Sequence, residues 1–359
     1  MKAARPAILG LLALALGACG GGSAPAASRA AGGSNATPVA AAGGSAAAPA
    51  PPTAAPVPLR VAGSGLSGNL MGPWAAYEGG YFQQQGLAVD GVPDIASSTT
   101  AVQTLLARDV DVVNITPNAA IEASLKGAVD MPMIADLPPG AGWWLYAAPE
   151  YHTLDELRGK QVGSNQVGSS SNYAVTYAFR QRGMEAGRDY TLLVIGNQPA
   201  LVAALEQGQI QAGAFSAPST IQARRAGFAE LLDLNDIPFN ANGPIVRRDA
   251  LDDGAGHEAL MRYLKATVQA IARLRQDPAF GRQVLEKYLK IQDAEVLEEV
   301  YQAYLPKRVP LVDPDGITPV MESIAERDPS ARGADPRRFY DDSLVDELQR
   351  SGFIDALYR

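Results

Sequence analysis

The chain has 359 residues, a formal net charge of −8 at pH 7 and an isoelectric point near 5.0. This acidic balance, without any basic run, argues against nucleic acid as a partner. The single cysteine, Cys19, excludes an intrachain disulfide, and with only two histidines we expect no metal site. Roughly 300 residues after position 58 have a globular composition, which is enough for two units with separate cores.

The N-terminus has the pattern of an export signal. Lys2 and Arg5 precede an apolar run over residues 8–16, and Leu16-Gly17-Ala18-Cys19 follows with small residues before the cysteine. The run is far shorter than the roughly 20 residues that span a bilayer. The tetrapeptide resembles the bacterial lipobox, in which the cysteine carries a lipid and becomes the mature N-terminus. We therefore predict a signal peptide over residues 1–18 and a lipid at Cys19 as the only membrane attachment.

Residues 19–58 have the composition of a tether. Gly, Ala, Ser, Pro and Thr make up nearly all of this segment, and Arg29 is its only charged residue. Such a sequence buries too little apolar surface to fold. A flexible chain of about 40 residues has a typical span of roughly 35 Å, which is enough to hold a domain away from a membrane.

Strands and helices alternate through the first half of the globular part. We predict strands at residues 59–62, 87–92, 110–115, 131–135, 191–195 and 211–215, and a further short strand that begins at residue 161. Helices are predicted at residues 73–85, 100–107, 119–126, 173–182 and 199–207. Thr153 and Glu156 fit a capping box. The alternation indicates parallel sheets flanked by helices, and the chain becomes helical after Gly256.

The alternating pattern occurs twice. Gly63-Ser64 and Gly68 recur 100 residues later as Gly163-Ser164 and Gly168, and the helix–turn–strand stretches around Leu105 and Leu205 keep the same register. Matches in register at two elements indicate two similar lobes. In each lobe a glycine-containing loop follows the first strand.

The second of these loops leads into a helix that begins with three serines. A helix N-terminus leaves backbone N–H groups free and carries a partial positive charge, so it can hold an anionic or polar solute. Ser169, Ser170 and Ser171 add hydroxyl donors at this position. The alternative is that one of these serines is only the N-cap of an ordinary helix.

Three segments carry a family resemblance. They are residues 105–112, residues 153–173 with the capping box, the Arg158-Gly159-Lys160 turn and the serines, and residues 203–212. Together they resemble the periplasmic solute-binding proteins of ABC importers in the nitrate, sulfonate and taurine group, which are related to binders of thiamine pyrimidine precursors. The chain departs from the family at Gln211, where an acidic residue is frequent, and at Phe215-Ser216-Ala217-Pro218, where a bulky aromatic often follows the strand.

The resemblance implies an α/β fold of the type II periplasmic-binding-protein class. This fold is a two-lobed clamshell in which each lobe is a mostly parallel sheet flanked by helices, and here it would end in a helical C-terminal region. We expect lobe one over residues 59–147, lobe two over residues 148–235, and a return to lobe one over residues 236–359. Hinges are expected at residues 147–151 and 234–243. The partners implied are an ABC permease and its ATPase.

Ligands bind beyond the carboxyl ends of parallel strands, and these ends give the candidate site. The residues are Ser64, Gly65, Ser67, Asn69, Ser98, Thr99, Thr116, Asn118 and Asp136 in lobe one, Ser169, Ser170, Ser171, Asn172, Asn197 and Ser216 in lobe two, and Trp143. They are mostly hydroxyls and amides. Trp143 either stacks on a ligand or belongs to the core, and Asp136 either binds an amino group or ends a turn.

Other motifs do not support an enzyme. Residues 63–68 spell G-x-G-x-x-G after a strand, but the next helix begins too late to hold a pyrophosphate. His257-Glu258 lacks the second histidine of a zinc-protease helix, and no nucleophile–base pair is visible. We therefore predict a protein that is not an enzyme and has no cofactor and no metal.

The function predicted from these patterns is capture of a small polar organic solute, similar to a sulfonate, taurine or nitrate, and its delivery to a membrane permease. The alternatives are a thiamine pyrimidine precursor or another aromatic solute in the same kind of importer, or a ligand-sensing adaptor domain of the envelope. We expect a monomer in the cell envelope, with its body in the periplasm or on the outer face of the cytoplasmic membrane.

Overall fold

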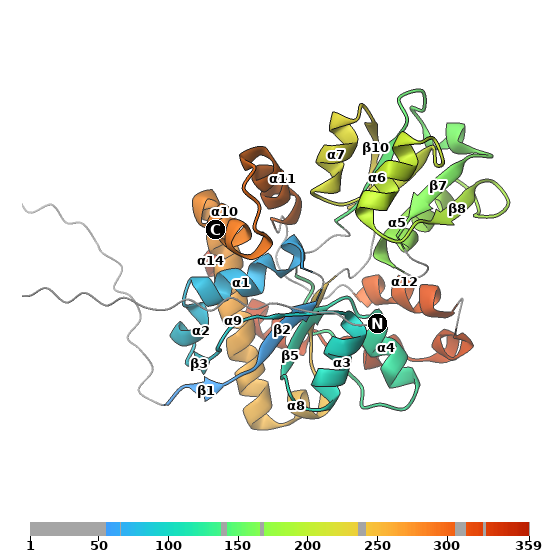
Figure 1. Ribbon diagram of the computed structural model, residues 1–359. Coiled ribbons are helices and arrows are strands. Elements are labelled where there is room, and N and C mark those ends of the chain that lie inside the picture. Colours follow the sequence, from blue (N-terminus) through green and yellow to red (C-terminus); the bar gives the residue numbers. More distant parts are fainter. Residues whose placement is uncertain are drawn as a thin grey trace, which may run out of the picture. The chain divides into compact units, whose positions relative to one another are not determined.

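The computed structural model describes residues 55–64, 66–137, 142–165, 169–235, 242–305, 314–325 and 328–358 (Figure 1). The predicted signal peptide, Cys19, most of the tether and the candidate residue Gly65 lie outside the described residues. No helix of the described segments is long and apolar enough to cross a membrane.

The first sheet has the strand order β11-β5-β2-β4. β2 (Val61–Ser64) is parallel to β4 (Asp94–Ile95) and to β5 (Val112–Ile115), and β11 (Gly243–Ile245) is antiparallel to β5. All residues of β2 and β5 are buried, as expected for strands covered on both faces. A separate small sheet pairs β1 (Val57–Pro58) with β3 (Leu87–Ala88).

Helices cover both faces of the first sheet. α3 (Ser98–Leu106) and α4 (Asn118–Leu125) pack on one face, and α1 (Met71–Glu78) and the long helix α9 (Gly254–Gln276) pack in a second core with α2 (Tyr81–Gln84) (Figure 1). The single helix predicted over residues 73–85 is split into α1 and α2. The break occurs at Gly79 and Gly80, where Gly80 adopts a φ of 70° that helical residues cannot have.

The second sheet has the strand order β10-β6-β9-β7-β8. β7 (Gln161–Ser164) is parallel to β8 (Thr191–Val194) and β9 (Ala212–Phe215), whereas β6 (Trp144–Ala147) and β10 (Ala229–Asp233) form an antiparallel edge. Because β6 belongs to this sheet, the predicted lobe boundary after residue 147 falls too late. The predicted hinge at residues 147–151 is wrong for the same reason, since Ala148 N donates to Gln211 O within the second lobe (3.0 Å).

The helices of the second lobe follow its strands. α5 (Ser170–Arg180) packs on one face of the sheet, and α6 (Gln198–Glu206) and α7 (Ser219–Arg225) pack on the other. The predicted capping box is confirmed: Thr153 and Glu156 cap the short 3-10 helix η2 (Leu154–Leu157).

The chain then returns to the first sheet through β11 and is helical to its end. The remaining helices are α8 (Arg248–Asp252), α10 (Pro278–Leu289), α11 (Ala294–Tyr304), α12 (Pro314–Ala325), α13 (Ser343–Arg350) and α14 (Phe353–Tyr358), with 3-10 helices η1 (Gly68–Leu70), η3 (Pro329–Gly333) and η4 (Pro336–Arg338). The strand predicted at residues 131–135 is wrong. Among the described residues, Met133 forms isolated bridges to Ile245 and Tyr340, and no strand runs through this segment.

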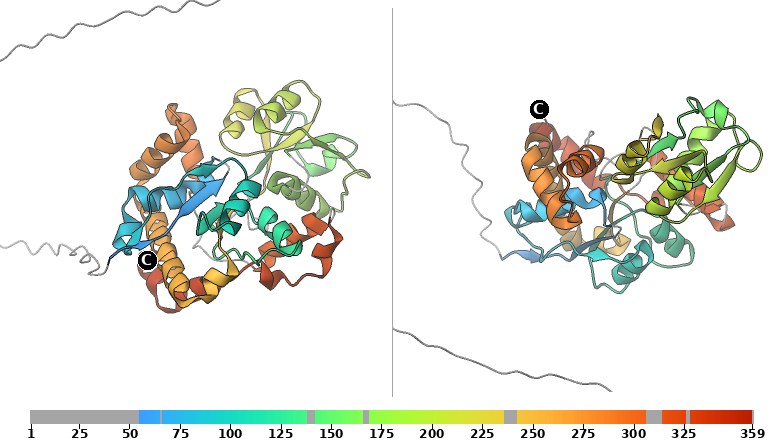
Figure 2. Two further views of the ribbon diagram at one scale, coloured as in Figure 1. Left: turned by 60° about the horizontal axis from the view of Figure 1, so that its bottom comes forward. Right: turned by 45° about the horizontal axis from the view of Figure 1, so that its top comes forward.

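Two helices of the C-terminal region contact the second lobe. α12 packs in one cluster with Ile121 of α4 and Tyr173 of α5, and its red ribbon lies beside both lobes in Figure 2. α11 belongs to the core of the first lobe through Leu297, Val300 and Tyr301, and it also contacts α7. The fold class predicted from the sequence, an α/β protein with two lobes and a helical C-terminal region, is confirmed.

Candidate functional site

The serine-rich start of α5 is held by its own hydroxyl groups. Ser169 is the N-cap, and its Oγ accepts a hydrogen bond from Asn172 N (3.3 Å) and lies 3.0 Å from Ser171 Oγ. Ser171 is fully buried, and its Oγ accepts from Asn165 N (3.2 Å). Ser169 and Ser171 therefore fix the loop between β7 and α5, so their hydroxyls already have a structural role.

Ser170 is the member of this group whose hydroxyl can still donate to a solute. Trp143 Nε1 donates a hydrogen bond to Ser170 Oγ (3.0 Å), and both residues are partly exposed. A serine hydroxyl that accepts in this way keeps its own hydrogen for donation. Trp143 thus lies beside the helix N-terminus where the sequence analysis predicts that a solute binds.

A hydrogen-bond network joins this loop to the neighbouring strands. Asn172 Nδ2 donates to the fully buried Ser164 Oγ (3.2 Å) at the end of β7. Gln198 Nε2 donates to Asn165 Oδ1 (2.7 Å), and Gln198 Oε1 accepts from Ser216 N (3.1 Å). The sequence analysis did not include Gln198, although it ties two predicted loops together.

Asn197 has a local structural role. Its side chain accepts from Ala200 N (3.0 Å), which makes it the N-cap of α6. The hydrogen bond satisfies one of the free N–H groups at the start of that helix, and the residue itself is exposed. Its position agrees with the predicted strand end after β8.

The candidate residues of lobe one lie along the carboxyl edge of the first sheet. Because β2, β4 and β5 are parallel, their carboxyl ends share one edge of the sheet. The residues that follow these ends are Ser64, Ser67, Asn69, Ser98, Thr99, Thr116 and Asn118. Ser67 caps η1 by accepting from Asn69 N (3.4 Å). Asp136 is buried, with 5% of its surface exposed.

Tyr304 connects the predicted loops of the two lobes. This buried residue ends α11, and its ring packs so closely on Gly68 that a Cβ there would overlap it. Its hydroxyl donates to Ala217 O (3.4 Å), directly after Ser216. Burial raises the pKa of Tyr304 to about 12, so the phenol keeps its proton at neutral pH.

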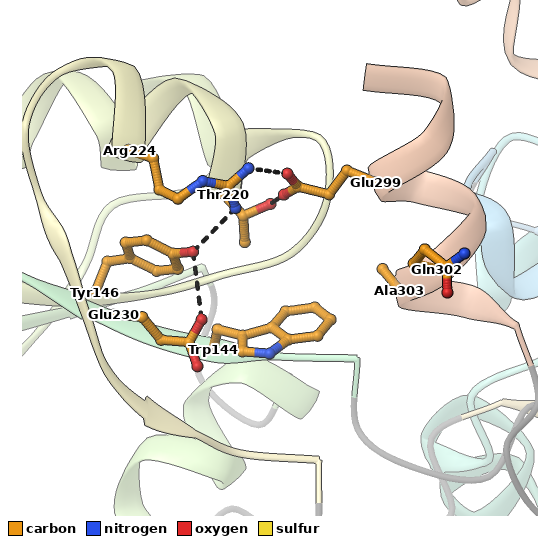
Figure 3. Close-up of a pocket in the computed structure, with 8 residues that line it drawn as sticks. All are labelled: Trp144, Tyr146, Thr220, Arg224, Glu230, Glu299, Gln302 and Ala303. Carbon is orange, nitrogen blue, oxygen red and sulfur yellow. Dashed lines mark hydrogen bonds and ion pairs between the residues drawn. The ribbon is translucent and has the colours of Figure 1, made fainter. Parts of the chain in front are cut away.

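A second group of residues surrounds a cavity of about 240 Å³ (Figure 3). Its lining comes from β6, α7 and β10 of the second lobe and from α11, and consists of Trp144, Tyr146, Thr220, Arg224, Glu230, Glu299, Gln302 and Ala303. None of these residues was predicted as a site residue. The nearest sequence signal is the pair Arg224-Arg225, which has no recognisable motif around it.

Hydrogen bonds run along one wall of this cavity. Glu299 accepts from the Thr220 hydroxyl and pairs with the Arg224 guanidinium, and Arg224 Nη1 lies 3.4 Å from the Tyr146 hydroxyl. The hydrogen bond to Glu299 raises the pKa of Arg224, whereas burial raises the pKa of Tyr146. The Tyr146 hydroxyl lies 3.5 Å from Glu230 Oε2, as the dashed lines of Figure 3 show.

Comparison with known sequences assigns the chain to a family. The sequence profile of the NMT1-like family matches residues 71–286, which is more than half of the chain. The chain belongs to the NMT1-like family. Among curated proteins, no sequence matches it significantly.

Solved structures of the same fold come from several bacteria. The chain is similar to the periplasmic aliphatic sulphonate binding protein SsuA of Escherichia coli, with 18% identity, a TM-score of 0.64, and coverage of 80% of this chain and 93% of that one. For a putative periplasmic sulfonate-binding protein of Methylobacillus flagellatus, the identity is 14% and the TM-score is 0.68. The match covers 84% of this chain and 96% of that one. For the periplasmic nitrate-binding protein NrtA of Synechocystis, the identity is 13% and the TM-score is 0.58. The match covers 85% of this chain and 91% of that one.

These similarities confirm the resemblance and the fold predicted from the sequence. These three neighbours are described as binding proteins. Within the described segments, no cluster of three or more His, Cys, Asp or Glu side chains has the arrangement of a metal site.

Proposed function

We propose that the protein is the solute-binding component of an ABC importer and that it binds a small oxyanion of the sulfonate or nitrate type between its lobes. The observation that carries this proposal is the start of α5, an 11-residue helix that begins with Ser170-Ser171 next to the indole of Trp143. Free N–H groups and the helix dipole at this end favour an anion. The similarity to sulfonate- and nitrate-binding proteins supports the same class of solute.

Closure of the lobes would couple binding to transport. A solute that contacts both lobes favours their closed arrangement by its higher affinity for that state. Tyr304 supports such a link, because it packs on Gly68 near Ser67 and Asn69 and donates to Ala217 beside Ser216. A permease and its ATPase would then receive the closed form. We further propose that Cys19 carries a lipid and keeps the body, as a monomer, at the cell envelope.

A thermal-shift screen tests the proposed solute class. The purified protein is heated with methanesulfonate, taurine, nitrate, and an aminopyrimidine as the aromatic alternative. At 100 times its Kd a ligand adds about 2.7 kcal/mol to the free energy of unfolding, which raises the melting temperature by several degrees. We expect this shift with one of the oxyanions. If none of them shifts the transition while the aminopyrimidine does, the proposed class is wrong.

The aminopyrimidine is a second candidate because of one contact. Trp143 is partly exposed and is oriented by its hydrogen bond to Ser170, so its ring can stack on a flat solute. Replacement of Trp143 with Leu distinguishes between the oxyanion and the aminopyrimidine as the bound solute. It should abolish most binding of a stacked pyrimidine and weaken an oxyanion only modestly, because the helix N-terminus remains.

A further inference from the structure

The cavity of Figure 3 has an uncompensated negative charge. Of its charged groups, Glu299 and Arg224 pair with each other, and Thr220 adds a hydrogen bond to Glu299. Within the described residues, the only hydrogen-bonding contact of the Glu230 carboxylate is with the Tyr146 hydroxyl at 3.5 Å, well beyond the usual O–H···O distance of about 2.7 Å. The Glu230 carboxylate therefore faces the cavity without a close partner.

The surroundings of Glu230 disfavour its negative charge. Partial burial and the nearby Asp233 raise the pKa of Glu230, and Glu299 acts in the same direction. The Tyr146 hydroxyl and the Arg224 guanidinium lower it to a smaller extent. Since Arg224 is already engaged by Glu299, a further positive charge in the cavity would relieve this repulsion.

An aromatic ring borders the same space. Figure 3 shows the Trp144 indole extending from β6 toward Gln302 and Ala303 of α11, with the Glu230 carboxylate beside it. The face of an indole attracts cations, and a neighbouring carboxylate can add a charge-assisted contact to an ammonium group. The volume of about 240 Å³ has room for a small organic molecule.

We propose that this cavity is a second binding site, separate from the serine-rich start of α5, and that it takes a small organic cation with a primary or quaternary ammonium group. The ammonium group lies against the Trp144 ring and pairs with Glu230. The walls come from the second lobe and from α11, which belongs to the core of the first lobe, so the complete site exists only when α7 and α11 are in contact.

Calorimetric titration of the full chain with choline tests this proposal, and the neutral isostere 3,3-dimethyl-1-butanol is the reference ligand. The two molecules have nearly the same shape and differ in the charge. We expect choline to bind at one site per chain and the isostere to bind at least about tenfold more weakly, because a cation–aromatic contact and an ion pair each contribute to affinity. Equal affinities would overturn the proposal, and so would the absence of choline binding.

Matched variants locate the site. Glu230→Gln should weaken choline binding about tenfold, and Trp144→Leu should weaken it to a similar extent. Glu206→Gln removes the same charge from an exposed position at the end of α6 and should leave the affinity unchanged. If Glu206→Gln and Glu230→Gln have the same effect, the cation responds only to net charge and the site is wrong. The titration contains no oxyanion, so its result does not depend on the proposed solute.

Discussion

At the residue scale, Tyr304 links the two lobes near the candidate site, because it packs closely on Gly68 and also contacts the second lobe. The ring occupies the space that a side chain at residue 68 would need, and the hydroxyl reaches Ala217 of the second lobe. Local sequence signals identified Ser67 and Asn69 beside Gly68, but not Tyr304. It lies more than 200 residues away in the chain and carries no motif, so only tertiary packing brings it there.

Replacement of Gly68 with Ala tests this packing. The added methyl group would overlap the Tyr304 ring, and overpacking of this kind costs roughly 1–3 kcal/mol. We expect a loss of that size in the free energy of unfolding, measured by urea denaturation. Gly254→Ala is the control, because a methyl group there meets no atom within 4 Å. Equal stability of the two variants would contradict the close contact.

Because the pKa of Glu230 is raised, we expect the stability of the protein to depend on pH. Its pKa is raised in the folded state, so the folded protein binds this proton more tightly than the unfolded chain does, and stability falls as the pH rises through the raised pKa. Glu230→Gln removes this penalty. We expect the variant to be more stable than the parent at pH 7, with the difference vanishing below the unfolded pKa of about 4.3. A variant that is less stable at pH 7 would rule out the raised pKa.

At the element scale, α7 and α11 form an ionic contact between the lobes. Arg224 pairs with Glu299, and Arg225 Nη2 lies 2.5 Å from Glu295 and 3.6 Å from Asp293. α7 packs on the second sheet, whereas α11 packs against α10 and η1 of the first lobe. These pairs therefore stabilise the arrangement in which the two helices touch.

Solute binding should consequently depend on salt. Exposed ion pairs each contribute up to about 1 kcal/mol and are screened at high ionic strength. We expect Arg224→Gln to weaken solute binding two- to fivefold in 50 mM NaCl. The affinity of this variant should also differ less between 50 and 500 mM NaCl than the affinity of the parent does. Arg262→Gln is the control, because its ion pair with Glu258 lies within α9. An Arg224→Gln variant with the salt dependence of the parent would exclude a role for these pairs in closure.

Some strands and helices could be predicted from the sequence, and others could not. The buried strand Val112–Ile115 and the helices Ser98–Leu106 and Gln198–Glu206 follow local patterns of apolar residues and N-caps. The antiparallel pairing of β6 with β9 and β10 could not be predicted, because no local signal states which sheet a strand joins. The serines at the start of α5 were identified by a local signal, whereas the cavity of Figure 3 combines elements up to 159 residues apart, from Trp144 to Ala303.

At the scale of the whole molecule, the central claim is that a small oxyanion binds at the start of α5 between the lobes. Ser170 is the residue that tests this claim without loss of structure. Its hydroxyl accepts from Trp143, while the loop itself is held by Ser169, Ser171 and Asn172. Loss of one hydrogen bond to a charged ligand costs about 1.5–3 kcal/mol, which corresponds to a factor of about 10 to 150 in affinity.

Calorimetric titration with the oxyanion that gives the largest thermal shift measures this directly. We predict one site per chain, an affinity at least about tenfold lower for Ser170→Ala, and no change for Thr191→Ala, an exposed residue at the opposite end of the second sheet. An unchanged affinity of Ser170→Ala would contradict the account.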